Sequence, residues 1–185
     1  PSKFISELAN LEEFKKATDY KIKTHRMLDR DFANRFLAFY ELGVDNYGSK
    51  EYGQDLDTFM SKAMASVYDK TEDELNTIKL KFADAMKLAK TIFGKETFRK
   101  VYKDYKKIPP INKALFDAIS TQFALLNKDE VIRLKENKAL LKKQLKIELR
   151  DDDSFFKSLT SSTGNKGNTQ YRHQKVRELI QNAII

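Results

Sequence analysis

Residues 26–40 read Arg26-Met27-Leu28-Asp29-Arg30-Asp31-Phe32-Ala33-Asn34-Arg35-Phe36-Leu37-Ala38-Phe39-Tyr40. Large apolar side chains return every three or four positions, which predicts one amphipathic helix over 26–42 that ends at Gly43. Other helices must cover such an aromatic stripe, because burial of each Phe contributes about 1.5–3 kcal/mol. The stretch therefore predicts a core helix of a helical bundle.

The rest of the chain favours helices as well. Its 185 residues include only 6 Gly and 3 Pro, so sharp turns are few. Helical apolar spacing and capping signals predict further helices over 3–17, 56–67, 71–93, 95–105, 111–126, 153–159 and 171–185, and a helix or a helix pair over 130–149. We predict an all-α protein, a single multi-helix bundle of about eight or nine helices over residues 1–185. The strongly apolar segment 111–126 is expected to be its central helix.

Several classes of chemistry lack the residues they need. The absence of cysteine excludes disulfides and Cys-based zinc sites, and the two histidines are far apart in sequence. No nucleophile motif surrounds any serine, and the paired acids lie where helix caps place them. We therefore assign no catalytic residue, no metal site and no cofactor. No apolar run approaches the roughly 18 residues of a membrane span and no signal peptide is visible, so we expect a cytoplasmic protein without a membrane partner.

The net charge of +8 is unevenly distributed. Residues 1–93 carry a net charge of −1, whereas residues 94–185 carry +9. A basic half attracts polyanions, nucleic acid first. The alternative is a lysine-rich surface that is simply solvated.

Three basic features stand out in this half. The Gly-rich loop 161–169 contains Lys166 and precedes Arg172 and Lys175, an arrangement that suits phosphate binding; the alternative is a flexible loop with Thr169 as helix cap. A stripe of lysines lies on one face if 130–149 is a single helix, and its alternative is a solvated face. A third run, over 95–107, is interleaved with tyrosines that stack either on bases or in the core. The stripe comprises Lys135, Lys138, Lys142 and Lys146.

Three motifs resemble one bacterial family. They are Arg26-Met27-x-Asp29-Arg30-Asp31 with Arg35–Tyr40, Ile111–Phe116, and Ser161–Gly164 followed by Tyr171, Arg172 and Val176. The family is related to ParB and sulfiredoxin, occurs at the front of GmrSD-type restriction enzymes, and is known mainly as a domain of unknown function. The resemblance covers essentially the whole chain in the same order. It departs from the family pattern at 32–34 and at 165–167.

The resemblance implies what this chain lacks. The family's Asp-Gly-Gln-Gln-Arg motif, which is linked to nucleotide hydrolysis, is absent, as is a nuclease domain. We therefore expect the C-terminal helical fragment of a larger protein whose N-terminal ParB-like NTPase part is its partner. The matching motif residues are expected to be structural rather than catalytic, with Arg26 and Asp29 as a half-buried pair. These residues are Arg26, Asp29, Arg30, Asn112 and Lys113.

The resulting hypothesis is a helical, DNA-associated scaffolding module of a ParB-like restriction or phage-defence protein, non-catalytic by itself. DNA is the expected partner, and self-association into a homo-oligomer remains open. The alternative is a purely structural or protein-interaction domain with no nucleic-acid contact. An enzyme would need a nucleophile or a metal cluster that the sequence does not display.

Overall fold

The computed structural model describes residues 1–185 and consists of ten α-helices with short 3-10 turns and no strand. The predicted all-α fold is confirmed, with slightly more helices than expected. The helices are α1 (Ser2–Asn10), α2 (Glu12–Ala17), α3 (Leu28–Leu42), α4 (Leu56–Ser66), α5 (Glu72–Phe93), α6 (Lys113–Ala124), α7 (Lys128–Glu136), α8 (Lys138–Asp151), α9 (Asp153–Ser158) and α10 (Lys166–Ile184).

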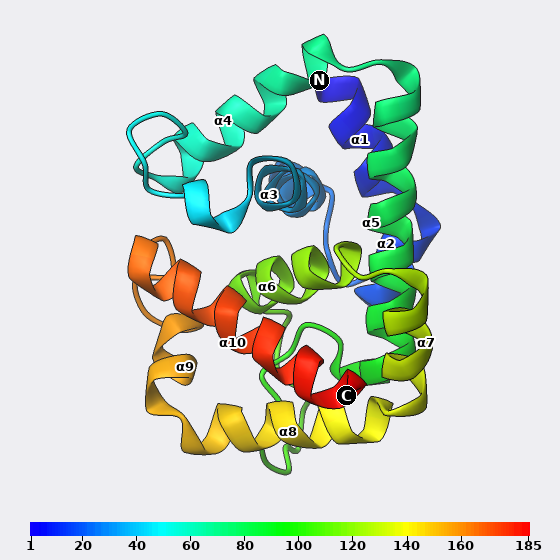
Figure 1. Cartoon of the computed structure of the whole chain (residues 1–185), viewed down its shortest axis with the longest axis vertical. Helices are drawn as coiled ribbons and strands as arrows, with labels where there is room; N and C mark the ends of the chain where they lie inside the picture. Colours follow the sequence, from blue (N-terminus) through cyan, green and yellow to red (C-terminus); the bar gives the residue numbers. More distant parts are fainter.

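Helix α6 is the centre of the molecule, as its apolar sequence predicted. Every residue from Ala114 to Ala124 is buried, and α3, α5 and α10 pack around the helix (Figure 1). It begins at Asn112, whose side chain accepts a hydrogen bond from the Leu115 amide at 2.8 Å. The same side chain donates to the Leu159 carbonyl at 2.8 Å, so the cap also ties α6 to the end of α9.

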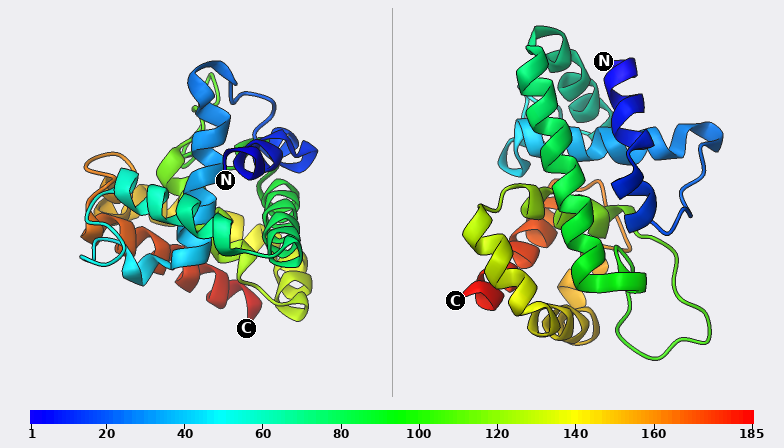
Figure 2. Two further views of the ribbon diagram at one scale, coloured as in Figure 1. Left: turned by 90° about the horizontal axis from the view of Figure 1, so that it is seen from above. Right: turned by 90° about the vertical axis from the view of Figure 1, so that its right-hand side faces the viewer.

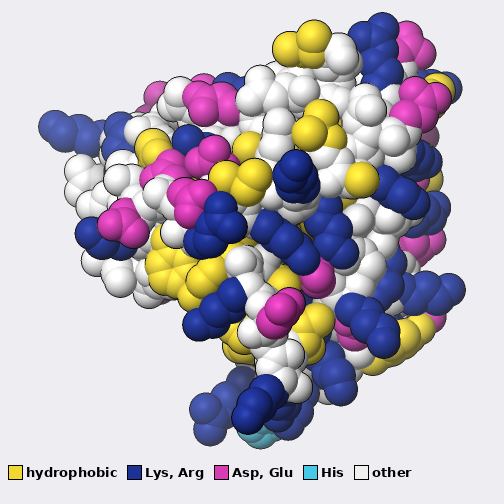
Figure 3. All heavy atoms as spheres, turned by 90° about the horizontal axis from the view of Figure 1, so that it is seen from below, with side chains coloured by type: hydrophobic (Ala, Val, Ile, Leu, Met, Phe, Trp, Pro, Cys, Tyr) yellow, Lys and Arg dark blue, Asp and Glu magenta, His cyan; other side chains and the backbone are white.

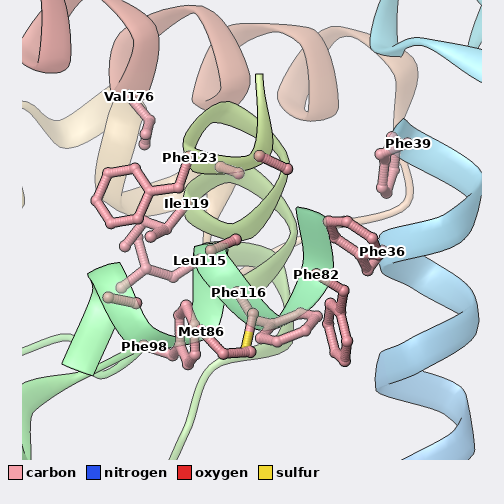
Figure 4. Packing of buried hydrophobic residues seen from close by; sticks show 14 of the residues in the cluster. Phe36, Phe39, Phe82, Met86, Phe98, Leu115, Phe116, Ile119, Phe123 and Val176 are labelled. Carbon is pink, nitrogen blue, oxygen red and sulfur yellow. The ribbon is translucent and has the colours of Figure 1, made fainter. Parts of the chain in front are cut away.

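Aromatic rings from several helices interlock around α6 (Figure 4). The Phe116 ring lies edge-on to Phe32 of α3 and to Phe98, with centroid separations of 4.8 Å in both pairs. Phe36 of α3 lies 4.6 Å from Phe82 of α5. Tilted and edge-on pairs are favourable because the ring edge and ring face carry opposite partial charge. The aromatic stripe of α3 is thus covered by α5 and α6.

The other side of α3 is buried too, and it carries charge. Arg35 of α3 donates from Nε to Asp117 Oδ1 of α6 at 2.8 Å, and a second guanidinium nitrogen binds the other carboxylate oxygen. Arg172 of α10 approaches Asp117 Oδ2 to 3.5 Å. The exposed fractions of the three side chains are 8%, 0% and 1%, so this triad is sealed from water.

The carboxylate of Asp117 is shared unequally. Burial opposes the charge on Arg35, but the bidentate contact with Asp117 outweighs it and raises the pKa of Arg35. For Arg172 burial dominates and lowers the pKa. Its Nη1 donates to the carbonyl oxygens of Thr163, at 2.7 Å, and Ser158, at 3.4 Å, whereas its Nε has no hydrogen-bond partner. The triad therefore joins α3, α6, α10 and the loop before α10.

Two expected helices near the N-terminus have different ends. The predicted helix over 3–17 is broken at Leu11, whose extended backbone separates α1 from α2. Helix α3 begins at Leu28 rather than at residue 26, because Arg26 and Met27 adopt left-handed backbone angles, with φ of 58° and 55°. The spacing of apolar residues predicts a helix in both segments, but it carries no signal for a break at a single residue.

In the C-terminal half one expectation is wrong and one open alternative is decided. The predicted helix over 95–105 is a loop, because Phe98 has a φ of 58° and is buried in the core, while Arg99 beside it pairs with Ile111 as an isolated bridge. The sequence left either one helix or a helix pair open over 130–149, and the structure has the pair, α7 and α8, which meet at Asn137. Both breaks arise where the chain must turn to keep packing on α6 and α10.

Removing the shared carboxylate should destabilise the fold strongly. In Asp117→Ala two buried guanidiniums lose their counter-ion, which typically costs about 3–5 kcal/mol. Urea unfolding followed by circular dichroism measures this loss. The matched control is Asp84→Ala, since Asp84 is 72% exposed and pairs only with Lys87, so its loss should stay below about 1 kcal/mol. Equal losses in the two variants would contradict a stabilising role for the triad.

Candidate nucleic-acid interface

The loop over 97–112 projects from the end of the molecule where α8 lies (Figure 1). Its two ends are tied together: the Asn112 amide donates to the Phe98 carbonyl at 2.8 Å, and the Arg99 guanidinium donates to the Pro109 carbonyl. Arg99 is buried and also lies 3.7 Å from Asp19. These contacts hold the base of the loop and leave its outer part facing solvent.

A cleft of about 280 Å³ lies under this loop. Its walls are aromatic and proline side chains, with Phe156 of α9 reaching in from far along the chain. Tyr102 lies edge-on to Phe156 at 5.5 Å and to Tyr105 at 5.9 Å. The volume is at the small end of ligand clefts, which suits one planar group. The lining residues are Lys100, Tyr102, Tyr105, Pro109, Pro110, Ile111, Asn112 and Phe156.

Lysines surround these rings. The Lys100 ammonium lies 5.0 Å from the centre of the Phe156 ring, and the Lys103 ammonium lies 5.6 Å from the centres of both Tyr102 and Tyr105. Such cation–π contacts hold the ammonium groups beside the cleft without neutralising them. Burial lowers the pKa of Lys100. Burial also raises the pKa of Tyr105 to about 12, so its phenol stays protonated at neutral pH.

The loop carries an uncompensated positive charge. Residues 100–107 contain four lysines and one acid, Asp104, and none of the four lysines forms an ion pair. Lys106 and Lys107 at the outer end are exposed. Figure 3 looks at this end of the molecule and shows Lys and Arg side chains around hydrophobic patches, with fewer acidic ones between them.

The predicted lysine stripe is not a single face. Lys135 lies on α7, whereas Lys138, Lys142 and Lys146 lie on α8, beyond the corner at Asn137. Two of the α8 lysines are neutralised by Glu96, at 3.1 Å from Lys142 and 3.0 Å from Lys146. Only Lys135 and Lys138 are exposed without an ion pair, and they belong to different helices.

The basic residues of the predicted phosphate loop point in different directions. Asn165, not Thr169, caps α10 by accepting a hydrogen bond from the Asn168 amide. Lys166 is the first residue of the helix and is exposed, with its aliphatic stem lying across Gly48. Arg172 points inward, so the prediction that it binds phosphate at the surface is wrong: the Asp117 triad sequesters its guanidinium.

Lys175 also faces carboxylates of its own chain. Its ammonium lies 3.1 Å from Asp152 and 3.3 Å from Glu148. Burial by itself would lower the pKa of Lys175, but the two acids outweigh burial and raise it. Of the three basic residues expected around this loop, only Lys166 keeps an unpaired charge at the surface.

The family-motif residues occupy structural positions with different roles. Arg26 is exposed and forms no ion pair, so the expected pair with the buried Asp29 is absent. Arg30 is half-buried beside α1. Lys113 binds Asp31 of α3 at 2.8 Å, which ties the first turn of α6 to the first turn of α3. Together with the Asn112 cap, this contact positions the start of the central helix.

Two features of the structure, one in the cleft and one in the core, were not predicted from the sequence. The sequence showed the basic and aromatic residues of the 95–107 run but placed them on a helix. Phe156 lies some fifty residues away, and no local signal connects it to that run. Asp117 was hidden in an apolar helix, and a lone acid between Phe116 and Ala118 was its only signal.

Searches of protein-family models, of curated proteins and of solved structures find no match to this chain. The resemblance to the ParB-related family therefore depends on the three sequence motifs alone. The structure contains no helix of sufficient length and apolarity to span a membrane. It also contains no cluster of three or more His, Cys, Asp or Glu side chains arranged to hold a metal ion.

His173 provides a test of the buried surroundings of α10. It is fully buried, both ring nitrogens lack a hydrogen-bond partner, and the ring lies 4.8 Å from Phe39. Burial, with the charges of Arg172, Arg177 and Arg35, lowers its pKa well below 6.5. Below pH 6.5 the His173 imidazole therefore binds a proton in the unfolded chain but not in the folded chain, so the free energy of unfolding falls as the pH falls.

Because His173 stays neutral in the folded protein, we expect the wild-type protein to lose about 1.4 kcal/mol of unfolding free energy for each pH unit below the ordinary histidine pKa. His173→Leu should remove this part of the acid loss and leave the rest. Urea unfolding at several pH values between 7.5 and 5.5 measures the difference (the range stays roughly above most carboxylate titrations). His25→Ala is the control, because His25 is exposed. The same pH dependence in His173→Leu as in the wild-type protein would contradict the assignment.

Proposed function

We propose that this chain is a non-catalytic nucleic-acid-binding module and that the loop over 100–112 holds a polynucleotide strand. The observation that carries the proposal is a small aromatic cleft flanked by two lysines, Lys100 and Lys103, that have no carboxylate partner. Three lysines beside the same end of the molecule, Lys142, Lys146 and Lys175, are instead paired with acids of the chain. The loop therefore combines unpaired lysines with aromatic rings.

The lysines supply the contacts to phosphate. An ammonium without a counter-ion gains a full ion pair with a phosphate, and the counterions released from the strand make such binding dependent on salt. Lys142 and Lys146 would first have to leave Glu96. We therefore assign the backbone contacts to Lys100, Lys103 and Lys107 rather than to Lys142 and Lys146.

The cleft supplies a contact to one base. A planar base can lie against Tyr102 or Phe156, and stacking of this kind tolerates any sequence because every base has a π-face. In a duplex the bases are already stacked on each other and cannot enter a cleft of this size. The proposal therefore favours single strands or splayed ends over continuous duplex.

The wider setting is proposed on the sequence motifs. A helical scaffolding module of a ParB-like restriction or phage-defence protein would place this interface beside an N-terminal ParB-like domain, with DNA as the shared ligand. The alternative, a structural or protein-interaction domain, requires no contact between the loop and nucleic acid. The two differ in their response to changes in the loop.

Charge reversal in the loop should weaken binding of a labelled single strand. We expect Lys103→Glu with Lys107→Glu to lower the affinity for an oligo-dT at least about tenfold and to reduce the salt slope by about 2, measured by fluorescence anisotropy at several salt concentrations. The matched control is Lys62→Glu on α4, an exposed lysine without an ion pair at the opposite end of the molecule (Figure 1).

A second variant isolates the aromatic contribution. Tyr102→Ser leaves the loop charge unchanged and should weaken binding of the single strand by about 1–3 kcal/mol while changing duplex affinity little. Absence of binding to any oligonucleotide at low ionic strength would contradict the proposal and favour the protein-interaction alternative. If Lys62→Glu weakened oligo-dT binding equally, the effect would come from net charge and the loop would not be the binding site.

A further inference from the structure

A second concave surface lies on another side of the molecule. Helices α5 and α7 run beside each other there (Figure 2, right) and enclose a groove of about 770 Å³. The groove is lined by a stripe of α5 from Thr77 to Thr91, by the end of α6, and by a stripe of α7 from Lys128 to Lys135. The α5 stripe spans about 21 Å at 1.5 Å per residue.

The groove has an apolar floor and apolar walls. Leu88, Phe123 and Leu126 form the floor and are buried in the core. Leu80 of α5 and Ile132 of α7 form opposite walls, and their exposed fractions are 64% and 56%. Two large aliphatic side chains exposed to this extent on facing helices are unfavourable in water unless another surface covers them.

The rim of the groove is basic. Lys81, Lys128 and Lys135 lie along it without an ion pair, while Lys87 is paired with Glu13 and Asp84, at 3.6 Å in each case. Asp84 is the only acid that lines the groove. An occupant must therefore be apolar on the side that enters and negatively charged along its edges.

We propose that this groove binds an acidic amphipathic helix of a partner protein. Helix-in-groove recognition places apolar anchors at i, i+4 and i+7 between two supporting helices, and Leu80 and Ile132 are positioned to receive them. Glutamate or aspartate beside the anchors would meet Lys81, Lys128 and Lys135. The length of the α5 stripe matches a helix of about four turns.

Other occupants fit less well. A second copy of the chain in a symmetric contact would bring the basic rim against itself, which like charges disfavour. A nucleic acid would meet a floor whose one aromatic ring, Phe123, is buried and cannot stack on a base. The groove is also separate from the loop cleft, since the two share no lining residue.

The test uses the 185-residue protein and two labelled synthetic peptides of about 16 residues each, about four helical turns. Both carry Leu at i, i+4, i+7 and i+11; one has Glu at the flanking positions and the other has Lys. Fluorescence anisotropy should show saturable binding of the Glu peptide and at least about tenfold weaker binding of the Lys peptide. Equal binding of the two, or no saturable binding of the Glu peptide, would overturn the proposal.

Variants locate the binding. Leu80→Ser and Ile132→Ser should each weaken binding of the Glu peptide about tenfold. Ile147→Ser on α8, the matched control, should not, because its exposed side chain lies outside the groove. Lys81→Glu with Lys128→Glu should reverse the preference toward the Lys peptide. Circular dichroism checks that each variant is folded. We expect all of them to fold, because the wall residues are exposed.

Two further readings complete the test. Sedimentation that shows a dimer dispersed by Ile132→Ser would identify a second copy as the occupant and overturn the proposal. Leu80→Ser should leave oligo-dT affinity unchanged, so the proposals for the groove and for the loop cleft are tested independently. A loss of oligo-dT binding in Leu80→Ser would instead assign nucleic acid to the groove and overturn the acidic-helix occupant.

Discussion

The buried carboxylate of Asp117 is the contact on which the arrangement of helices depends. It lies in the middle of α6 with no exposure to water, and it binds a guanidinium from α3 on one side and approaches another from α10. Each of these charges would be strongly unfavourable in the interior alone. A helix that shifted along α6 would separate a charge from its partner, whereas apolar packing tolerates small shifts. The triad therefore specifies the register in which α3 and α10 meet α6.

Ion pairs within the chain explain why the C-terminal basic half is less basic at its surface than its composition implies. Arg172 is drawn inside, and Lys142, Lys146 and Lys175 are paired with Glu96, Glu148 and Asp152. The charge that remains free at this end of the molecule lies on the loop over 100–107 and on exposed α8 lysines such as Lys138. That loop is anchored at its base by Arg99 and by the amide of Asn112, so its outer residues need not contribute to the core.

Two surfaces with different chemistry result from this arrangement. The loop cleft combines aromatic rings with unpaired lysines and is small, which suits a base with its phosphates. The groove between α5 and α7 combines aliphatic walls with a basic rim and is long, which suits a helix. Both surfaces attract negatively charged partners, and the difference between aromatic and aliphatic lining separates the two. A module that holds a strand at one place and a protein at another would act as a scaffold.

The sequence alone determined the helical class, most of the helices and the central position of α6, because apolar spacing and helix caps are local signals. It also located the basic and aromatic residues of the 95–107 run. Only the tertiary structure decided that Arg172 is buried, that the 130–149 segment bends at Asn137, and that Phe156 completes the cleft. The physical reason is that a charge's solvation and partners depend on residues distant in the chain. Local pattern records which side chains are present, whereas long-range packing decides which of them remain free to bind.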